Sequence, residues 1–182
     1  NSHVTKGIKY ITADIARLGD DSTIIYLWEG WSIKTRIEIK KSLITETARE
    51  IKNLSIRENV PMSRVVVDED GVGGGCRDIL NSMGFVANSR AIGHNNYANL
   101  KAQCGFYVAD MINRKLVHFD TDNITLIEKV KQELDWLREK DIDKDGKIRL
   151  LPKEEIKKAI RRSPDDLDNF IMRSFFELGQ KL

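Results

Sequence analysis

Residues 64–75 read Arg-Val-Val-Val-Asp-Glu-Asp-Gly-Val-Gly-Gly-Gly, and no other stretch says as much about the fold. The apolar run from Val65 to Val67 ends in an acid, Asp68. A short, nearly continuous apolar run is typical of a parallel strand that is buried on both faces. The glycines from Gly71 to Gly75 then break this pattern, and the sequence predicts a helix over 76–83 and a strand over 85–89.

The segment before this stretch has the pattern of an antiparallel meander. Residues 9–16, 23–28 and 32–39 are rich in β-branched and aromatic residues, which favours three strands. Glu29 and Gly30 supply the turn between the second and the third strand.

Helical patterns fill most of the remaining chain. Residues 44–59 carry apolar side chains at a spacing of three to four, which predicts an amphipathic helix. In the last helix we expect Ser163 to be the N-cap and Pro164 the first helical residue. Alternating helices and strands after a meander predict an α/β fold with a mixed sheet. The other predicted elements are helices over 98–114 and 124–137, a turn and strand over 141–151, a helix from Pro152, and the last helix over 163–178.

Length and composition indicate one ordinary globular domain. The chain has 182 residues, 41% of them hydrophobic, and we expect a single domain over residues 8–178. The start, Asn1-Ser2-His3, resembles a cleavage remnant, so residues 1–7 are expected to be remnant and lead-in, and 179–182 a tail. No apolar run reaches the roughly 18–20 residues of a membrane span, and no secretory signal is present.

Charge and cysteine content exclude some classes of site. The formal charge is +2, from 30 basic and 28 acidic residues, so DNA binding would need local segregation of charge. Cys76 and Cys104 lack the spacing of a zinc site or of a disulfide framework, which favours a reducing cytoplasm.

Four aspartates stand where an acid is costly to bury. Asp14 lies inside the first predicted strand, and Asp68 ends the most hydrophobic one. Asp165 and Asp168 open the last helix, three residues apart and so on one face. Buried acids need a partner or a cation, and several at one sheet edge would suit Mg²⁺ or Mn²⁺. Taken singly, each acid could instead end a strand, cap a turn or complement a helix dipole.

Three motifs in order resemble those of the nuclease domain of the viral terminase large subunit. Residues 14–23 (DIARLGDDST) are similar to its first motif, and residues 66–75 (VVDEDGVGGG) to its second. Residues 163–169 (SPDDLDN) resemble the third motif, although the family usually has Ala where Asn169 stands. Residues 146–148 (GKI) and 152–157 (PKEEIK) resemble the stretch before the third motif.

The resemblance implies a ribonuclease H-like fold, with a mixed five-stranded sheet flanked by helices. It also implies a DNA endonuclease that uses Mg²⁺ or Mn²⁺, with two ions hydrolysing the phosphodiester bond. Asp14, Asp68 and Asp165 become the catalytic metal ligands and Asp168 an auxiliary ligand; the weaker metal-site candidates are Asp21, Asp70 and Asp166.

The resemblance also implies partners and a location. The substrate is double-stranded concatemeric viral DNA, and the partners are a terminase ATPase domain, a portal and a small terminase subunit. The location is the cytoplasm of the bacterial host. The ATPase motif GxxxxGK[ST] is absent, so this chain should not hydrolyse ATP unaided.

Basic and glycine-rich segments supply candidate DNA contacts. The glycine turn after Asp68 would let the DNA backbone approach closely, and the basic side chains would contact phosphate. Alternatively, these residues belong to a turn, a loop and a solvated face. The candidates are Gly73, Gly74, Arg90, Lys101, Lys157 and Arg161.

Two further interpretations compete with the terminase resemblance. Residues 141–148 copy the first half of an EF-hand loop, but Pro152 stands where a bidentate Glu is required, so we expect an acidic turn. Junction resolvases and transposase-like nucleases share the same order of acids. A DNA- or protein-docking module without catalysis is the non-enzymatic alternative.

Overall fold

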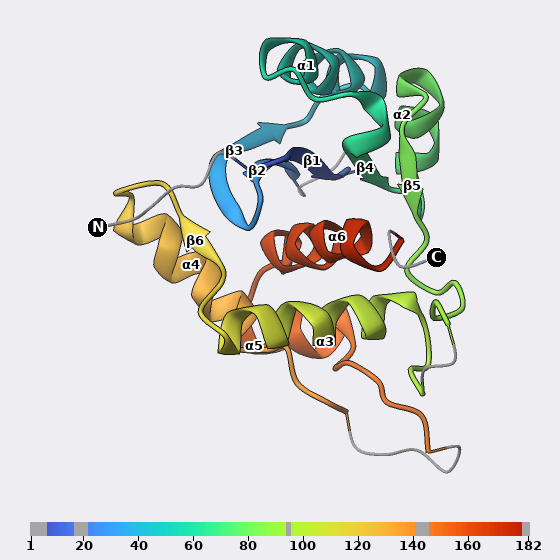
Figure 1. Ribbon diagram of the computed structural model, residues 1–182, viewed down its shortest axis with the longest axis vertical. Coiled ribbons are helices and arrows are strands. Elements are labelled where there is room, and N and C mark those ends of the chain that lie inside the picture. The colour runs from blue at the N-terminus through green and yellow to red at the C-terminus, as the bar shows by residue number, and fades with distance from the viewer. Residues whose placement is uncertain (1–6, 17–21, 94–95, 141–145, 180–182) are drawn as a thin grey trace.

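The structure is a computed structural model, and it describes residues 7–16, 22–93, 96–140 and 146–179. These residues form one sheet of six strands in the order β5-β4-β1-β2-β3-β6 (Figure 1). The strands are β1 (Lys9–Asp14), β2 (Ser22–Glu29), β3 (Ser32–Lys40), β4 (Val65–Asp68), β5 (Met83–Phe85) and β6 (His118–Phe119).

The sheet is mixed, as the sequence predicts. β1, β2 and β3 form the antiparallel meander, and β4 and β5 extend it in parallel from the other side of β1. The expected number of five strands is wrong, because β6 adds a sixth strand parallel to β3 at the edge. With only two residues, β6 is too short to show a strand periodicity.

Helices cover both faces of the sheet. α1 (Ile44–Arg57) and α2 (Gly73–Leu80) lie on one face, and α6 (Asp165–Gly179) crosses the other (Figure 1). α3 (Leu100–Asn113) packs against α6 on the side away from the sheet. The shorter elements are α4 (Ile124–Leu134), α5 (Lys153–Ile160) and the 3₁₀ turn η1 (Met62–Arg64).

Side-chain alternation along β1 divides the core in two. Ile11 and Ala13 pack in the cluster that α1 and α2 cover, while Tyr10 packs in the cluster that includes α6. Because alternate residues of a strand share a face, Asp14 lies on the same face as Tyr10 and Thr12. β1 therefore directs its terminal acid toward α6.

Several predicted boundaries differ from the structure. α2 begins at Gly73, three residues before the predicted start, and β5 covers 83–85 instead of 85–89. In place of the strand predicted within 141–151, residues 146–151 form only isolated bridges, such as Tyr97 with Ile148. The acidic turn predicted at 141–145 lies outside the described residues. No helix in the part of the chain that the structure describes is long and apolar enough to span a bilayer.

Candidate metal centre

β1 and β4 bring two of the predicted aspartates to the same end of the sheet. The parallel register pairs Ala13 with Val67, so Asp14 and Asp68 each follow one residue later on neighbouring strands. Val66 packs in the cluster on the α6 side, and Asp68, two residues on, shares that face. Both acids therefore face the start of α6.

The first turn of α6 supplies the other two predicted aspartates. Asp14, Asp165 and Asp168 each offer one carboxylate oxygen, and these oxygens lie within 4.8 Å of one another. Mg²⁺ takes oxygen ligands at about 2.0–2.1 Å, so ligands on opposite sides of one ion are roughly 4.2 Å apart. Small side-chain movements would therefore let all three carboxylates bind a single divalent ion.

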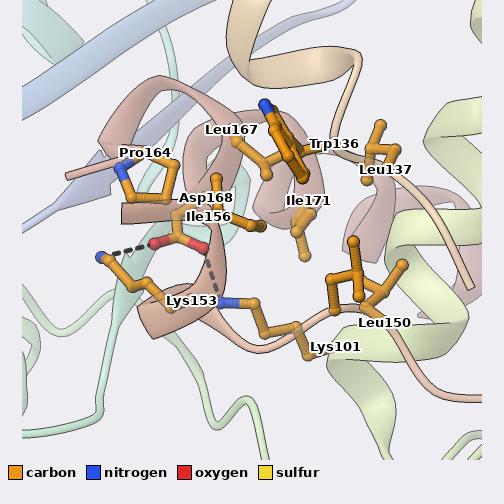
Figure 2. Close-up of a pocket in the computed structure, with 11 residues that line it drawn as sticks. Lys101, Trp136, Leu137, Leu150, Lys153, Ile156, Pro164, Leu167, Asp168 and Ile171 are labelled. Carbon is orange, nitrogen blue, oxygen red and sulfur yellow. Dashed lines mark hydrogen bonds and ion pairs between the residues drawn. The ribbon is translucent and has the colours of Figure 1, made fainter. Parts of the chain in front are cut away.

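Two lysines pair with this cluster. Lys153, at the start of α5, places its Nζ 2.7 Å from Asp168 Oδ2, 3.2 Å from Asp165 Oδ1 and 3.8 Å from Asp14 Oδ2. Lys101 of α3 donates to Asp168 Oδ1 at 2.6 Å, so the two ammonium groups hold the two oxygens of Asp168 (Figure 2). The Lys153 ammonium thus contacts all three carboxylates of the cluster.

Burial and mutual repulsion set the protonation of the acids. Burial, followed by repulsion from Asp168, raises the pKa of Asp14 well above its usual value, and Lys153 opposes this. Burial would also raise the pKa of Asp168, but Lys101 and Lys153 outweigh it and hold that pKa below the usual value. The centre therefore contains one acid that resists ionisation beside one that is firmly ionised.

Asp68 lies beside the three-carboxylate cluster without belonging to it. Its Oδ1 accepts a hydrogen bond from the Asp70 backbone N–H at 3.1 Å. Burial raises its pKa to about 6, and repulsion from Asp168 contributes, which indicates that the two carboxylates interact. Asp70 itself points elsewhere, since its Oδ2 accepts from the Ala87 backbone N–H at 3.2 Å.

Asp166, a weaker candidate, faces away from the cluster. Its side chain is 1% exposed and pairs with Arg36 at 2.6 Å and with Lys129 at 3.3 Å. The Tyr26 hydroxyl also donates to it at 2.8 Å. Burial raises the pKa of Asp166, but the hydrogen bond from Arg36 and the nearby cations lower it overall. We therefore exclude Asp166 from the metal set; Asp21 lies outside the described residues.

The glycines predicted as DNA contacts have a different setting. Gly73 is buried, and a β-carbon there would lie 1.6 Å from the Asp68 carbonyl oxygen. Gly73 therefore allows α2 to pack against the strand end, and we withdraw it as a DNA contact. Gly74 is partly exposed, with Glu69 as the nearest neighbour of an added β-carbon at 3.8 Å.

The basic candidates separate into two groups. Lys101 points into the acidic cluster, whereas Arg90, Lys157 and Arg161 are exposed. Lys157 lines a groove of about 380 Å³ next to Asp165. Both cations and acids line this groove, whose other charged residues are Arg36, Glu38, Lys129, Arg162 and Asp166.

The final helix begins differently from the prediction. The Asp168 N–H donates to the Pro164 carbonyl, so Pro164 precedes the helix and is not its first residue. The Ser163 hydroxyl donates to the Asp165 carboxylate instead of capping the helix. A side chain predicted as a cap thus contacts a candidate ligand.

Sequence reasoning missed the role of Lys153. Lys153 belongs to residues 152–157, the segment that precedes the third motif. Only this place in the sequence could have indicated a contact with the acids of the last helix. The buried pairing of Thr12 with Asn169, at 2.7 Å, was also missed. These two residues are 157 positions apart, so no local pattern signals their contact.

Comparisons with known proteins find similar solved structures. No model of a known protein family matches the chain, and no curated protein does. The nuclease domain of the large terminase subunit gp2 of bacterial virus Sf6 superimposes with a TM-score of 0.78 at 21% identity, covering 93% of this chain and 88% of that one. A mutant of that domain with manganese and beta-thujaplicinol gives a TM-score of 0.80 at 20% identity, with the same coverage.

A second phage nuclease has a similar fold. The large terminase nuclease from thermophilic phage G20c with bound magnesium gives a TM-score of 0.63 at 18% identity, covering 92% of this chain and 80% of that one. At these identities the likeness concerns the fold, and it confirms the expected ribonuclease H-like α/β class.

Proposed function

We propose that this chain is a divalent-metal-dependent DNA endonuclease of the terminase type. The observation that carries the proposal is the meeting of Asp14, Asp165 and Asp168, with oxygens within 4.8 Å, at one end of the sheet. Two elements distant in sequence, β1 and α6, deliver these acids to one point, which turns and helix caps do not require. The similar phage structures, a terminase nuclease with magnesium and another with manganese, support the same chemistry.

The proposed reaction is hydrolysis of a phosphodiester bond in double-stranded DNA. Mg²⁺ or Mn²⁺, with two ions bound, would polarise the phosphate and lower the pKa of the attacking water. Asp14, Asp165 and Asp168 would hold the first ion, and Asp68, beside them on β4, would contribute to the second. Lys153 and Lys101 keep Asp168 ionised, and a metal ion would compete with their ammonium groups for its two oxygens.

We place the DNA backbone along the groove next to Asp165. Lys157 is exposed at the groove, and Lys129 and Arg162 lie nearby, so phosphates there would meet cations. Contacts to phosphate carry no sequence information, which fits cutting without sequence preference. Arg90, Arg161 and Gly74 are further exposed or partly exposed contact candidates.

In the cell we propose that the substrate is concatemeric viral DNA in the cytoplasm of the bacterial host. A terminase ATPase domain, a portal and a small terminase subunit would be the partners. The proposed junction-resolvase and transposase-like alternatives share the acids and differ in the DNA they cut.

The test compares cleavage of supercoiled plasmid and of a four-way junction with Mg²⁺, Mn²⁺ or EDTA. We expect metal-dependent plasmid cutting that Asp14→Asn and Asp165→Asn each abolish. Asp110→Asn is the matched control, because Asp110 is an exposed acid on α3. Wild-type cleavage by Asp14→Asn would remove that residue from the catalytic set. Cutting of the junction alone would favour a resolvase, and no metal binding at all would favour a docking module.

A further inference from the structure

A buried chain of polar side chains lies beneath the start of α6. Thr12, Trp28 and Asn169 are each 0% exposed. The Trp28 Nε1–H donates to Thr12 Oγ1 at 3.0 Å, and the Thr12 hydroxyl donates to Asn169 Oδ1 at 2.7 Å. Asn169 Nδ2 donates to the backbone carbonyls of Ile24 at 3.1 Å and Asp165 at 3.0 Å. Every polar atom of the Asn169 side chain is thus satisfied.

The direction of each hydrogen bond in this series of side chains is fixed. An indole N–H can only donate, so the Thr12 oxygen accepts from Trp28 and its hydroxyl donates a hydrogen bond to Asn169 Oδ1. Carbonyl groups can only accept, so the amide nitrogen of Asn169 must face Ile24 and Asp165. The orientation of the Asn169 side chain is therefore fixed by its partners.

The partners of Asn169 are the neighbours of the metal centre. Thr12 lies two residues before Asp14 on β1, and Ile24 is the cross-strand partner of Asp14 on β2. Asp165 is itself one of the three clustered carboxylates. The Asn169 side chain thus connects β1 and β2, the strands around Asp14, with the first turn of α6, which carries Asp165 and Asp168.

Apolar packing between α6 and the sheet cannot set this relation alone. Phe170 packs against Tyr26 and Trp28 of β2, but the hydrophobic effect is non-directional. Hydrogen bonds have narrow limits on distance and angle. A helix held by the bonds of Asn169 has one register on β1, and that register brings Asp165 and Asp168 to Asp14.

We propose that Asn169 is a positioning residue that fixes the first turn of α6 against β1 and so assembles the three-carboxylate metal site. This inference rests on the proposed metal site. Asn169 touches neither substrate nor metal, and it acts through Asp165 and through the strands that carry Asp14. Alanine at this position would retain none of the side-chain hydrogen bonds.

The experiment measures Mn²⁺ binding to the DNA-free protein by isothermal titration calorimetry. Loss of groups that orient metal ligands weakens affinity by about 10- to 100-fold. We expect Asn169→Ala to raise the dissociation constant within this range. Thr12→Val, which replaces the hydroxyl by a methyl group, should weaken binding in the same direction, and Thr12→Ser, which keeps the hydroxyl, should bind as the wild type does.

A control separates positioning from general loss of stability. The control is Ile51→Val, because Ile51 belongs to α1 and lies in the core on the opposite face of the sheet. Melting temperatures in EDTA identify the destabilisation of each variant, and binding is measured well below them. Equal Mn²⁺ affinity for Asn169→Ala and Ile51→Val would overturn the positioning role. Absence of Mn²⁺ binding and cleavage in the wild type would instead overturn the proposed function, and the inference with it.

Discussion

The close approach of α2 to Asp68 predicts opposite effects for two glycine substitutions in the same helix turn. A β-carbon on Gly73 would lie 1.6 Å from the Asp68 carbonyl oxygen, and real β-carbons essentially never approach closer than 3.0 Å. In Gly73→Ala the two groups must therefore separate by at least 1.4 Å, the difference between these distances. At Gly75 the nearest neighbour of an added β-carbon is Ile44 at 3.8 Å, an ordinary contact.

The magnitudes follow from these distances. Overpacking typically costs about 1–3 kcal/mol, so we expect Gly73→Ala to lower the free energy of unfolding by this amount. Gly75→Ala should be neutral or more stable by up to about 1 kcal/mol, because alanine favours helix over glycine. A shift of about 1 Å at a reacting group can cost roughly 100-fold in rate. Displacement of Asp68 in Gly73→Ala should therefore reduce cleavage by up to that factor.

Urea unfolding measures the free energy of each variant, and plasmid cleavage in Mn²⁺ measures its rate at a temperature where both are folded. Gly75→Ala, which leaves Asp68 untouched, should cut as fast as the wild type. The reasoning about close packing would be refuted if Gly73→Ala were as stable as Gly75→Ala. If it were destabilised but cut normally, the position of Asp68 would not matter for the reaction.

Three more predictions concern the charges of the site. Since Asp68 has a pKa of about 6 in the native state and the pKa of Asp14 is also raised, Mn²⁺ affinity should increase from about pH 5 to pH 7 as the ligands ionise. The native state retains the Asp68 proton longer than the unfolded state does, so the contribution of Asp68 to stability falls as pH rises from about 3.9 through 6. The gain in stability from Asp68→Asn, measured in EDTA, should therefore be larger at pH 7 than at pH 5, and an equal gain would contradict the raised pKa. Lys153→Ala should tighten Mn²⁺ binding about tenfold, or about 1.4 kcal/mol, because the Lys153 ammonium competes with the metal for the three carboxylates. The control Lys158→Ala, at an exposed lysine, should not change the affinity. Weaker Mn²⁺ binding by Lys153→Ala in calorimetry would count against this competition. Asp166→Ala should lose about 3–5 kcal/mol in urea unfolding, because it leaves the Arg36 guanidinium without its buried partner, and a loss below 1 kcal/mol would show that this pair is not structural.

The sequence predicted the parts of the fold that have a local periodicity. The apolar run from Val65 to Val67 became the parallel strand β4, between β5 and β1. Within the described residues, the meander and the helices α1 to α6 lie where patterns indicate them, apart from their ends. β6 was missed because pairing with β3, and not its own two residues, makes it a strand. The start of α2 was missed because three glycines disfavour a helix locally, while packing against Asp68 requires the smallest residue.

The site could be predicted only as far as helix and strand geometry reach. Asp165 and Asp168 share a face because they are three residues apart, whereas Asp166 turns to a different side and pairs with Arg36. That both Lys101 and Lys153 reach Asp168 depends on how α3 and α5 pack around α6, which no spacing in the sequence encodes. The same holds for Thr12 and Asn169, whose contact exists only once α6 lies on β1.

The balance of charge in the centre bears on how many ions it holds. Four carboxylates, those of Asp14, Asp68, Asp165 and Asp168, face two ammonium groups, those of Lys101 and Lys153. With all of them ionised, the formal charge is −4 + 2 = −2, which one divalent ion neutralises. A second ion would leave +2 in a buried site, a charge that needs a counter-ion, and the phosphate of bound DNA would supply one. We therefore expect one Mn²⁺ per chain without DNA and two in the presence of an uncleavable phosphorothioate duplex. Two ions bound tightly without DNA would show that the charge count of the metal-free centre does not control its occupancy.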